Sequence, residues 1–130
     1  MAAAENEGTV RRIFDAFARK DGFALRGLFA EDASWHVPGD SVMAGTHDGR
    51  EAIFAFLGQL PKETDGTYNS RLIDVLASHE RAAAVYHASG ERNGARLELE
   101  QLLLFTFRDG LVQTVLALPT DPGTFEAFWA

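Results

Sequence analysis

The chain has 130 residues, 46% of them hydrophobic, and carries a formal net charge of -7 at pH 7. This length predicts one domain that buries a core of its own, and the apolar fraction is typical of a globular protein rather than a disordered one. The acidic balance argues against nucleic acid or an anionic membrane surface as a partner, because both attract basic faces. The absence of cysteine excludes disulfides and thiolate chemistry.

The first eight residues, Met1 to Gly8, contain Glu5 and Glu7 and no apolar run, so they do not resemble a signal peptide. No apolar stretch approaches the roughly 20 residues that a membrane-spanning helix needs. We therefore expect a soluble, cytoplasmic protein without a membrane partner.

Helical periodicity occupies the first part of the chain. Apolar residues at helical spacing predict a helix from about Thr9, or from an earlier start, to Asp21-Gly22. A second, short helix should end at Glu31-Asp32. The first strand is expected from Ala33 to Val37, where Pro38-Gly39 stops it.

The second part of the chain is predicted to hold one more helix and then a meander of strands. The helix should start at Asp48 or Gly49, with Asp48 as its N-cap, and end at Pro61. The turn pairs Asn93-Gly94 and Asp109-Gly110 are typical of β-hairpins. The strands are expected at Tyr68 to Ser78, Arg81 to Glu91, Arg96 to Arg108 and Leu111 to Leu118, before a terminal helix or tail at Thr124 to Trp129.

Helices bunched before a meander indicate an α+β fold rather than βαβ units. Several segments in this order resemble the nuclear transport factor two-like superfamily, and within it the SnoaL-like polyketide cyclase branch and ketosteroid isomerase. These segments are Val10 to Ala33, Trp35-His36-Val37-Pro38-Gly39, Ala44-Gly45-Thr46, Gly49-Arg50-Glu51-Ala52-Ile53, Phe107-Arg108-Asp109-Gly110, Leu118-Pro119-Thr120-Asp121 and Phe128-Trp129.

The resemblance implies a single SnoaL-like domain over residues 1–130 with a cystatin-like cone. Three helices of the N-terminal half would pack on a strongly curved, mixed, mostly antiparallel sheet that encloses an apolar pocket. It also implies a homodimer formed through the outer sheet face. Members of the superfamily act as isomerases, cyclases, dehydratases and epoxide hydrolases, or bind ligands without catalysis.

The acid/base groups of the familiar enzymes are missing from the matching positions. Ketosteroid isomerase uses a carboxylate base, a tyrosine and a protonated aspartic acid, where this chain has Val37, Ile13 and Leu103. The cyclase branch often ends its last strand with a glutamate, a tryptophan and an aspartate. Those positions hold Thr114, Leu116 and Ala117 here. Neither constellation can operate in this protein.

Strand alternation, phased by the family's inward positions, predicts which side chains line the pocket. Tyr86 and Gln101 would be its polar groups, held by a ligand or by ordered water. Trp35 and Phe105 also fit a role in core packing. The predicted ligand-binding residues are Trp35, Val37, Met43, Phe54, Leu57, Tyr86, Gln101, Leu103, Phe105, Val115 and Ala117, with Phe17 and Ala88 beside them. Such a lining suits a flat, largely apolar small molecule.

His36 and His87 fall on the outward phase, toward sheet packing or a dimer face. If the phase were shifted by one residue, they would share the pocket as an acid/base pair. Asp40, after the Pro-Gly turn, either bonds local backbone or serves catalysis at the pocket mouth. Asp40 and His36 are therefore the candidate catalytic residues. The histidine spacing matches no metal signature, and we expect no metal and no cofactor.

Three functions remain open from the sequence. The first is a SnoaL-like enzyme of isomerase, cyclase or dehydratase type that acts on a small hydrophobic metabolite. The alternative is a non-catalytic binding protein for an apolar small molecule. A third, purely structural dimerisation domain would have its pocket filled by its own side chains.

Overall fold

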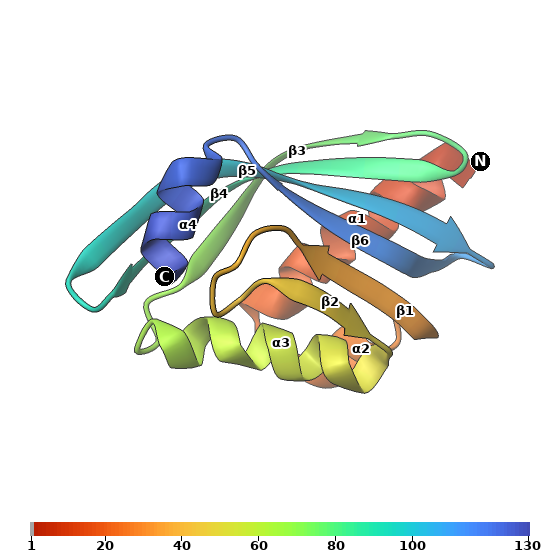
Figure 1. Ribbon diagram of the computed structural model, residues 1–130. Coiled ribbons are helices and arrows are strands. Elements are labelled where there is room, and N and C mark those ends of the chain that lie inside the picture. The colour runs from red at the N-terminus through yellow and green to blue at the C-terminus, as the bar shows by residue number, and fades with distance from the viewer. Residues whose placement is uncertain (1) are drawn as a thin grey trace.

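A computed structural model describes residues 2–130, and in this range it contains one six-stranded sheet and four helices (Figure 1). The strands are β1 Phe29–Val37, β2 Gly45–Asp48, β3 Asn69–Ala77, β4 Arg81–Arg92, β5 Ala95–Arg108 and β6 Leu111–Pro119. The helices are α1 Ala2–Ala18, α2 Gly22–Arg26, α3 Arg50–Glu63 and α4 Pro122–Trp129.

The sheet has the strand order β2-β1-β6-β5-β4-β3. Every neighbouring pair is antiparallel except β1 and β6, which run parallel. The predicted α+β class and the mixed, mostly antiparallel sheet are therefore confirmed. Both hairpin turns, Asn93-Gly94 and Asp109-Gly110, have positive φ angles at their two central residues, as the tight turns that favour these residue pairs require.

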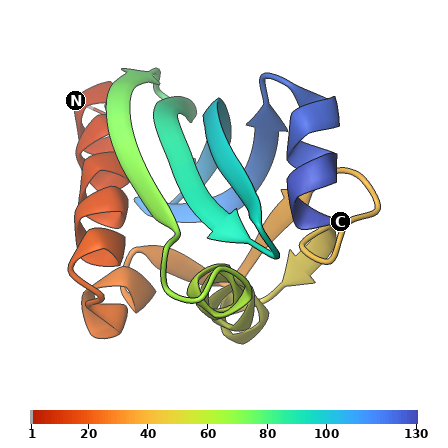
Figure 2. The same cartoon turned by 90° about the vertical axis from the view of Figure 1, so that its left-hand side faces the viewer.

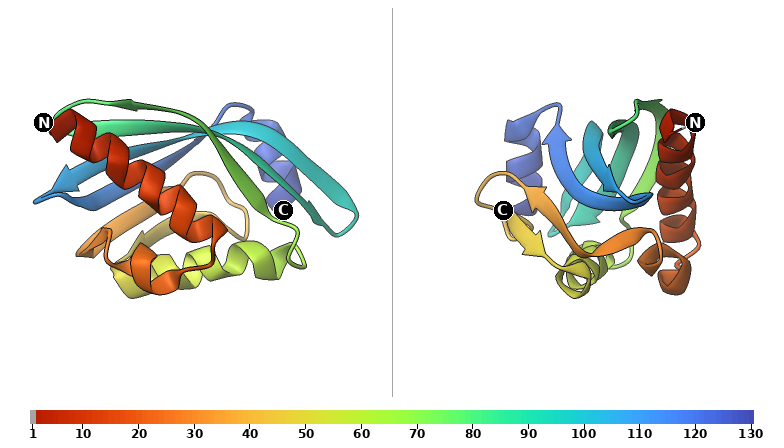
Figure 3. Two further views of the ribbon diagram at one scale, coloured as in Figure 1. Left: turned by 180° about the vertical axis from the view of Figure 1, so that it is seen from behind. Right: turned by 90° about the vertical axis from the view of Figure 1, so that its right-hand side faces the viewer.

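The helices gather on one face of the sheet. Helix α1 lies along β3 and β4 (Figure 3), α3 packs against β1 and β2, and α4 contacts β5. Figure 2 shows α1 beside one edge of the long strands and α4 beside the other, with α3 seen end-on below them. Together the three helices border this inner face of the sheet.

The alternation of side chains along each strand determines which residues lie on the inner face of the sheet. On β4 the inward residues are buried, and three of them are the small Ala82, Ala84 and Ala88. On the same face, the Phe14 ring of α1 packs against the Tyr86 ring, with 5.3 Å between the ring centroids. Elsewhere the core is closed by large buried side chains such as Phe29 and Ile53.

The N-terminal elements differ from the sequence prediction in their bounds. Helix α1 already begins at Ala2, and Thr9 lies inside it, where its hydroxyl donates to the Glu5 carbonyl instead of capping. Helix α2 ends at Arg26, and β1 starts at Phe29 rather than Ala33. The earlier start of β1 follows from pairing with β6, which no local pattern reveals.

The segment after Pro38 contains a strand, β2, that was not predicted from the sequence. Strand β2 pairs antiparallel with β1, so Asp48 is a strand residue and not the cap of α3. Gly49 takes the N-cap position, with φ at 89° and no side-chain cap bond. Pro61 does not end α3, which continues to Glu63. No helix within residues 2–130 is long and apolar enough to cross a membrane.

Candidate functional site

Two small adjoining cavities lie between the inner face of the sheet and the helices, each with a volume of about 40 Å³. We call the one beneath α1 the outer lobe and the one beneath α4 the inner lobe. The outer lobe is lined by Ile13, Phe14, Phe17, Leu25, Trp35, Leu57, Leu60, Tyr68, Ser70, Tyr86 and Leu103. The inner lobe is lined by Trp35, Val37, Met43, Phe56, Leu60, Tyr68, Tyr86, Gln101, Leu103, Ala117, Phe125 and Trp129. Each lobe has room for a few water molecules, since one water needs roughly 10–15 Å³ by this measure.

A surface groove of about 510 Å³ adjoins the outer lobe. It runs between α1, α2, α3 and the start of β3. Phe17, Leu25, Leu57, Tyr68 and Ser70 line both the groove and the outer lobe. The outer and inner lobes in turn share several walls, Tyr68 and Tyr86 among them. The three spaces therefore form a series from the surface to the interior.

The polar groups of the two lobes form a cluster around the Tyr86 hydroxyl. Tyr86 and Gln101 are direct partners across β4 and β5, and the Gln101 Nε2 donates to the Tyr86 hydroxyl at 3.2 Å. The Tyr68 hydroxyl lies close enough to the Tyr86 hydroxyl for each to shift the pKa of the other. Gln101 is only 5% exposed, and its Oε1 is buried without a hydrogen-bond partner. An unmet buried acceptor costs about 1–3 kcal/mol, so this atom is a natural contact for a bound group.

Burial keeps both tyrosines in their neutral form. It raises the pKa of Tyr86 to about 12, although the hydrogen bonds with Gln101 and Tyr68 pull in the opposite direction. The pKa of Tyr68 is raised well above its usual value, first by burial and then by the neighbouring Tyr86. At physiological pH these hydroxyls donate and accept hydrogen bonds, and neither can act as a base.

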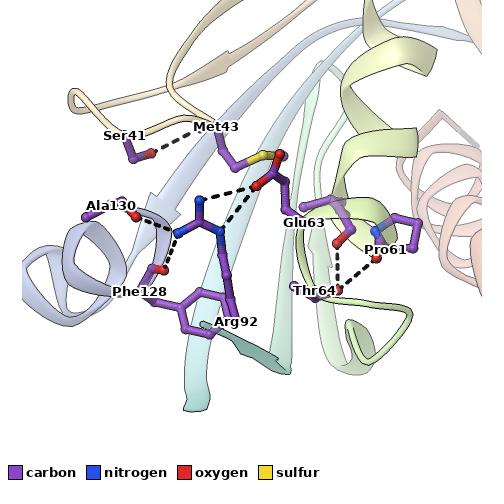
Figure 4. Close-up of polar contacts among 9 residues, drawn as sticks. Ser41, Met43, Pro61, Glu63, Thr64, Arg92, Phe128 and Ala130 are labelled. Carbon is purple, nitrogen blue, oxygen red and sulfur yellow. Dashed lines mark hydrogen bonds and ion pairs between the residues drawn. The ribbon is translucent and has the colours of Figure 1, made fainter. Parts of the chain in front are cut away.

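Helix α4 closes the inner lobe, and Arg92 at the end of β4 holds this helix in place (Figure 4). The Arg92 guanidinium donates to the carbonyl oxygens of Phe128 and Ala130, and also to Glu63 of α3 at 3.2 and 3.3 Å. Its side chain is 12% exposed. Because the last carbonyls of a helix lack partners within the helix, a cation at this point satisfies them.

The segment between β1 and β2 packs on the other side of α4. Gly39 has φ at 101°, and a Cβ built on it would lie 1.5 Å from the Glu126 carboxylate, so only glycine fits there. The Val42 amide donates to the Trp129 carbonyl at 3.4 Å. These contacts bring Met43 into the wall of the inner lobe.

Most of the predicted pocket residues lie where the strand phase placed them. Leu57 lines the outer lobe and the groove, whereas Phe54 lines only the groove. The residues that line the inner lobe are Trp35, Val37, Met43, Tyr86, Gln101, Leu103 and Ala117. Phe105 and Val115 were also predicted to line the pocket, and this prediction is corrected. Both side chains point inward, but they are packed in the core and line neither lobe.

The candidate catalytic residues lie outside both lobes. His36 is exposed on the outer sheet face, where its Nδ1 lies 2.7 Å from the Thr46 hydroxyl. His87 also faces outward, with its Nε2 3.8 Å from the Glu98 carboxylate. Asp40 is exposed in the loop, where its backbone amide donates to Glu126. The phase that turns both histidines outward is confirmed, so the acid/base pair of the shifted phase does not form.

Several residues that line the lobes were not predicted from the sequence. Tyr68 directly precedes β3 and shares the inward phase of Ser70 and Leu72, which lie opposite Ala88 and Tyr86. The predicted strand already began at Tyr68, so the same alternation applied to its first residue would have found it. Phe125 and Trp129 had no such signal, because long-range contacts dock α4.

The α+β fold is the one expected of a SnoaL-like domain. The model of the SnoaL-like domain family matches residues 10–115, and the chain belongs to the family. Its α+β architecture is the cystatin-like, or nuclear transport factor two-like, fold.

Three similar proteins cover nearly the whole chain. Bal32a, from a soil-derived mobile gene cassette, is 40% identical with a TM-score of 0.96, over 100% of both chains. A Xanthomonas campestris protein of unknown function with a cystatin-like fold is 28% identical, with a TM-score of 0.87, over 95% of this chain and 96% of that one. An uncharacterized protein of Mycobacterium tuberculosis is 36% identical over 122 residues, 93% of each chain.

The tyrosine environment predicts a loss of stability at high pH. An unfolded tyrosine ionises near pH 10 and folded Tyr86 near 12, so between these values the folded state binds more protons and the free energy of unfolding falls as pH rises. The full effect is about 3 kcal/mol for two pKa units. Because Tyr68 and Tyr86 are the only tyrosines, tyrosinate absorbance reports on these two groups alone. A titration midpoint near pH 10 in the folded protein would contradict the buried site.

The Arg92 contacts predict that Arg92→Leu loosens α4. We expect a loss of about 1–3 kcal/mol in the free energy of unfolding, because the Glu63 carboxylate and two carbonyls lose their donor. Amide hydrogen exchange should accelerate in α4 more than in the sheet. The control is Arg96→Leu: Arg96 is 61% exposed and pairs with Glu91 and Glu98, so its loss should cost less than about 0.5 kcal/mol. Equal effects of the two changes would refute the docking role of Arg92.

Proposed function

We propose that the protein binds a small, largely apolar molecule that enters through the groove and places one end in the lobes. The supporting observation is that the groove, the outer lobe and the inner lobe adjoin one another through shared wall residues. The two lobes are lined mainly by aromatic and aliphatic side chains, and a neutral polar cluster lies around the Tyr86 hydroxyl. Binding sites for small molecules typically combine apolar walls with a few placed polar groups.

The lining chemistry supports binding over proton abstraction. Among residues 2–130, the groups around the two lobes include no carboxylate and no imidazole. Tyr68 and Tyr86 have raised pKa values and do not replace the missing base. The hydrophobic effect would supply most of the affinity, at about 25 cal/mol per Å² of apolar surface removed from water.

The small lobes imply that the ligand widens them on entry. The side chain best placed to move is that of Tyr68. It lines the groove and both lobes, and it directly precedes β3 instead of lying within the strand. Its ring makes only aromatic contacts of ordinary distance on these sides, with centroids 6.4 Å from Phe17 and 6.2 Å from Trp129. A shift of this ring would join the outer and inner lobes into one space.

An enzyme of isomerase, cyclase or dehydratase type is the second candidate. The observation that favours it is the neutral Tyr86 hydroxyl, which could donate to an oxyanion that develops on a bound carbonyl compound. Confinement between aromatic walls would add orientation. In such an enzyme, Tyr86→Phe should lower turnover by about 100-fold while leaving ligand affinity nearly unchanged.

Ligand binding is tested with N-phenyl-1-naphthylamine, a neutral dye whose emission rises in apolar surroundings. Leu103 lines both lobes, so Leu103→Phe should weaken dye binding at least about tenfold by filling them. Leu76→Phe, on an exposed position of β3, is the control and should leave affinity within about twofold. Circular dichroism confirms that both variants fold. Equal binding by both variants would place the dye elsewhere and contradict the proposal.

We also propose that two copies associate through the outer face of the sheet. Leu102 pairs with Leu118, and Leu104 with Leu116, across β5 and β6, which gives an uncharged four-leucine patch. Contiguous apolar patches of this kind mark association surfaces. Light scattering should show a dimer for the native chain and a monomer for Leu104→Glu combined with Leu116→Glu. A monomeric native chain would refute this proposal.

A further inference from the structure

The unpartnered oxygen of Gln101 gives the proposed site a chemical preference. Gln101 Oε1 is a buried acceptor without a donor among the described residues, and its side chain lines the inner lobe. The other atom of the same amide, Nε2, is already committed to the Tyr86 hydroxyl. The lobe therefore offers an acceptor that a bound group can meet only by donating a hydrogen.

The Tyr86 hydroxyl supplies a hydrogen-bond donor beside this acceptor. Its oxygen accepts from Gln101 Nε2. The interaction with Tyr68 raises the pKa of Tyr68 and lowers that of Tyr86, as it does when Tyr68 is the donor, so the hydrogen of Tyr86 is available for the cavity. A single hydroxyl can accept from Tyr86 and donate to Gln101 Oε1, which closes a ring of hydrogen bonds and gives Oε1 its missing donor. A ketone or ether oxygen could accept from Tyr86 but would leave Oε1 unmet.

Charged ligand groups fit poorly here. Among residues 2–130, the lining of the inner lobe contains no lysine, arginine or histidine to neutralise an anion, and no carboxylate to neutralise a cation. Burying an unpaired charge in such surroundings is costly. The group that enters the lobe must be neutral.

We propose that the inner lobe binds a neutral hydroxyl group, alcohol or phenol, carried by an apolar molecule, with Gln101 as its acceptor and Tyr86 as its donor. This inference rests on the proposed function and specifies the class of ligand for the same site. It predicts that hydroxylated compounds bind more tightly than hydrocarbons or carbonyl compounds of equal size.

The test uses three bicyclic probes with one skeleton: tetralin, 2-tetralol and 2-tetralone. Their affinities are measured by displacement of N-phenyl-1-naphthylamine and by the fluorescence of Trp35 and Trp129, the only tryptophans, both of which line the inner lobe. We expect 2-tetralol to bind about tenfold more tightly than either of the other probes, the effect of one buried neutral hydrogen bond.

Gln101→Leu is the matched variant. It should reduce the advantage of 2-tetralol to less than about threefold while tetralin binds as well as before or better. Gln101→Met, with an unbranched side chain, gives the same comparison if the leucine variant does not fold. Circular dichroism and tyrosinate titration verify the fold of each variant.

The outcomes separate this inference from the proposed function. If no probe binds the native chain, the proposed function fails and this inference falls with it. If tetralin binds but 2-tetralol has no advantage, only the hydroxyl preference is overturned. Tighter binding of 2-tetralone would mean that the amide presents Nε2 to the lobe, and a preference that survives both Gln101 variants would place the acceptor elsewhere; either result overturns the assignment.

Discussion

The pairing of β4 with β5 is the constraint on which the candidate site depends. The ladder runs without a break from Arg81 opposite Thr106 to Arg92 opposite Ala95. Because side chains alternate, this register decides that Tyr86 and Gln101 face the helices while His87 and Glu100 face outward. A slip of one residue would exchange the two sets. The buried alanines and the tight Asn93-Gly94 turn oppose such a slip, so the polar cluster follows from backbone pairing.

The surroundings of this cluster then determine its chemistry. Tyr86 and Gln101 lie among aliphatic and aromatic groups, where burial favours the neutral forms of ionisable groups. A tyrosine that stays protonated to about pH 12 offers a fixed hydroxyl instead of a charge. The same dry environment makes each hydrogen bond in the cluster stronger and each unmet one more costly. Selectivity by hydrogen bonding is thus more natural here than acid/base chemistry.

The parts of the structure that could be predicted are those fixed by short-range rules. Strand alternation, with its phase taken from the family resemblance, placed Trp35, Tyr86 and Gln101 on the inner face, and residue type at the hairpin turns located both tight connections. Strand β2 was not predicted because four residues are too few to show the alternation of a strand. It can be identified only from its pairing with β1. The place of α4 was also beyond local reasoning, because Arg92, thirty or more residues away, and the loop at Gly39 hold it over the inner lobe.

The small alanines of β4 affect how much space the interior of this fold contains. Ala84 and Ala88 take part in the ladder between β4 and β5 through their backbones, and both residues are fully buried. A longer aliphatic side chain at either position would occupy interior space without removing one backbone hydrogen bond. The small size of these buried residues leaves interior space to the side chains around them. A point substitution at either position would change that space while the architecture stays the same.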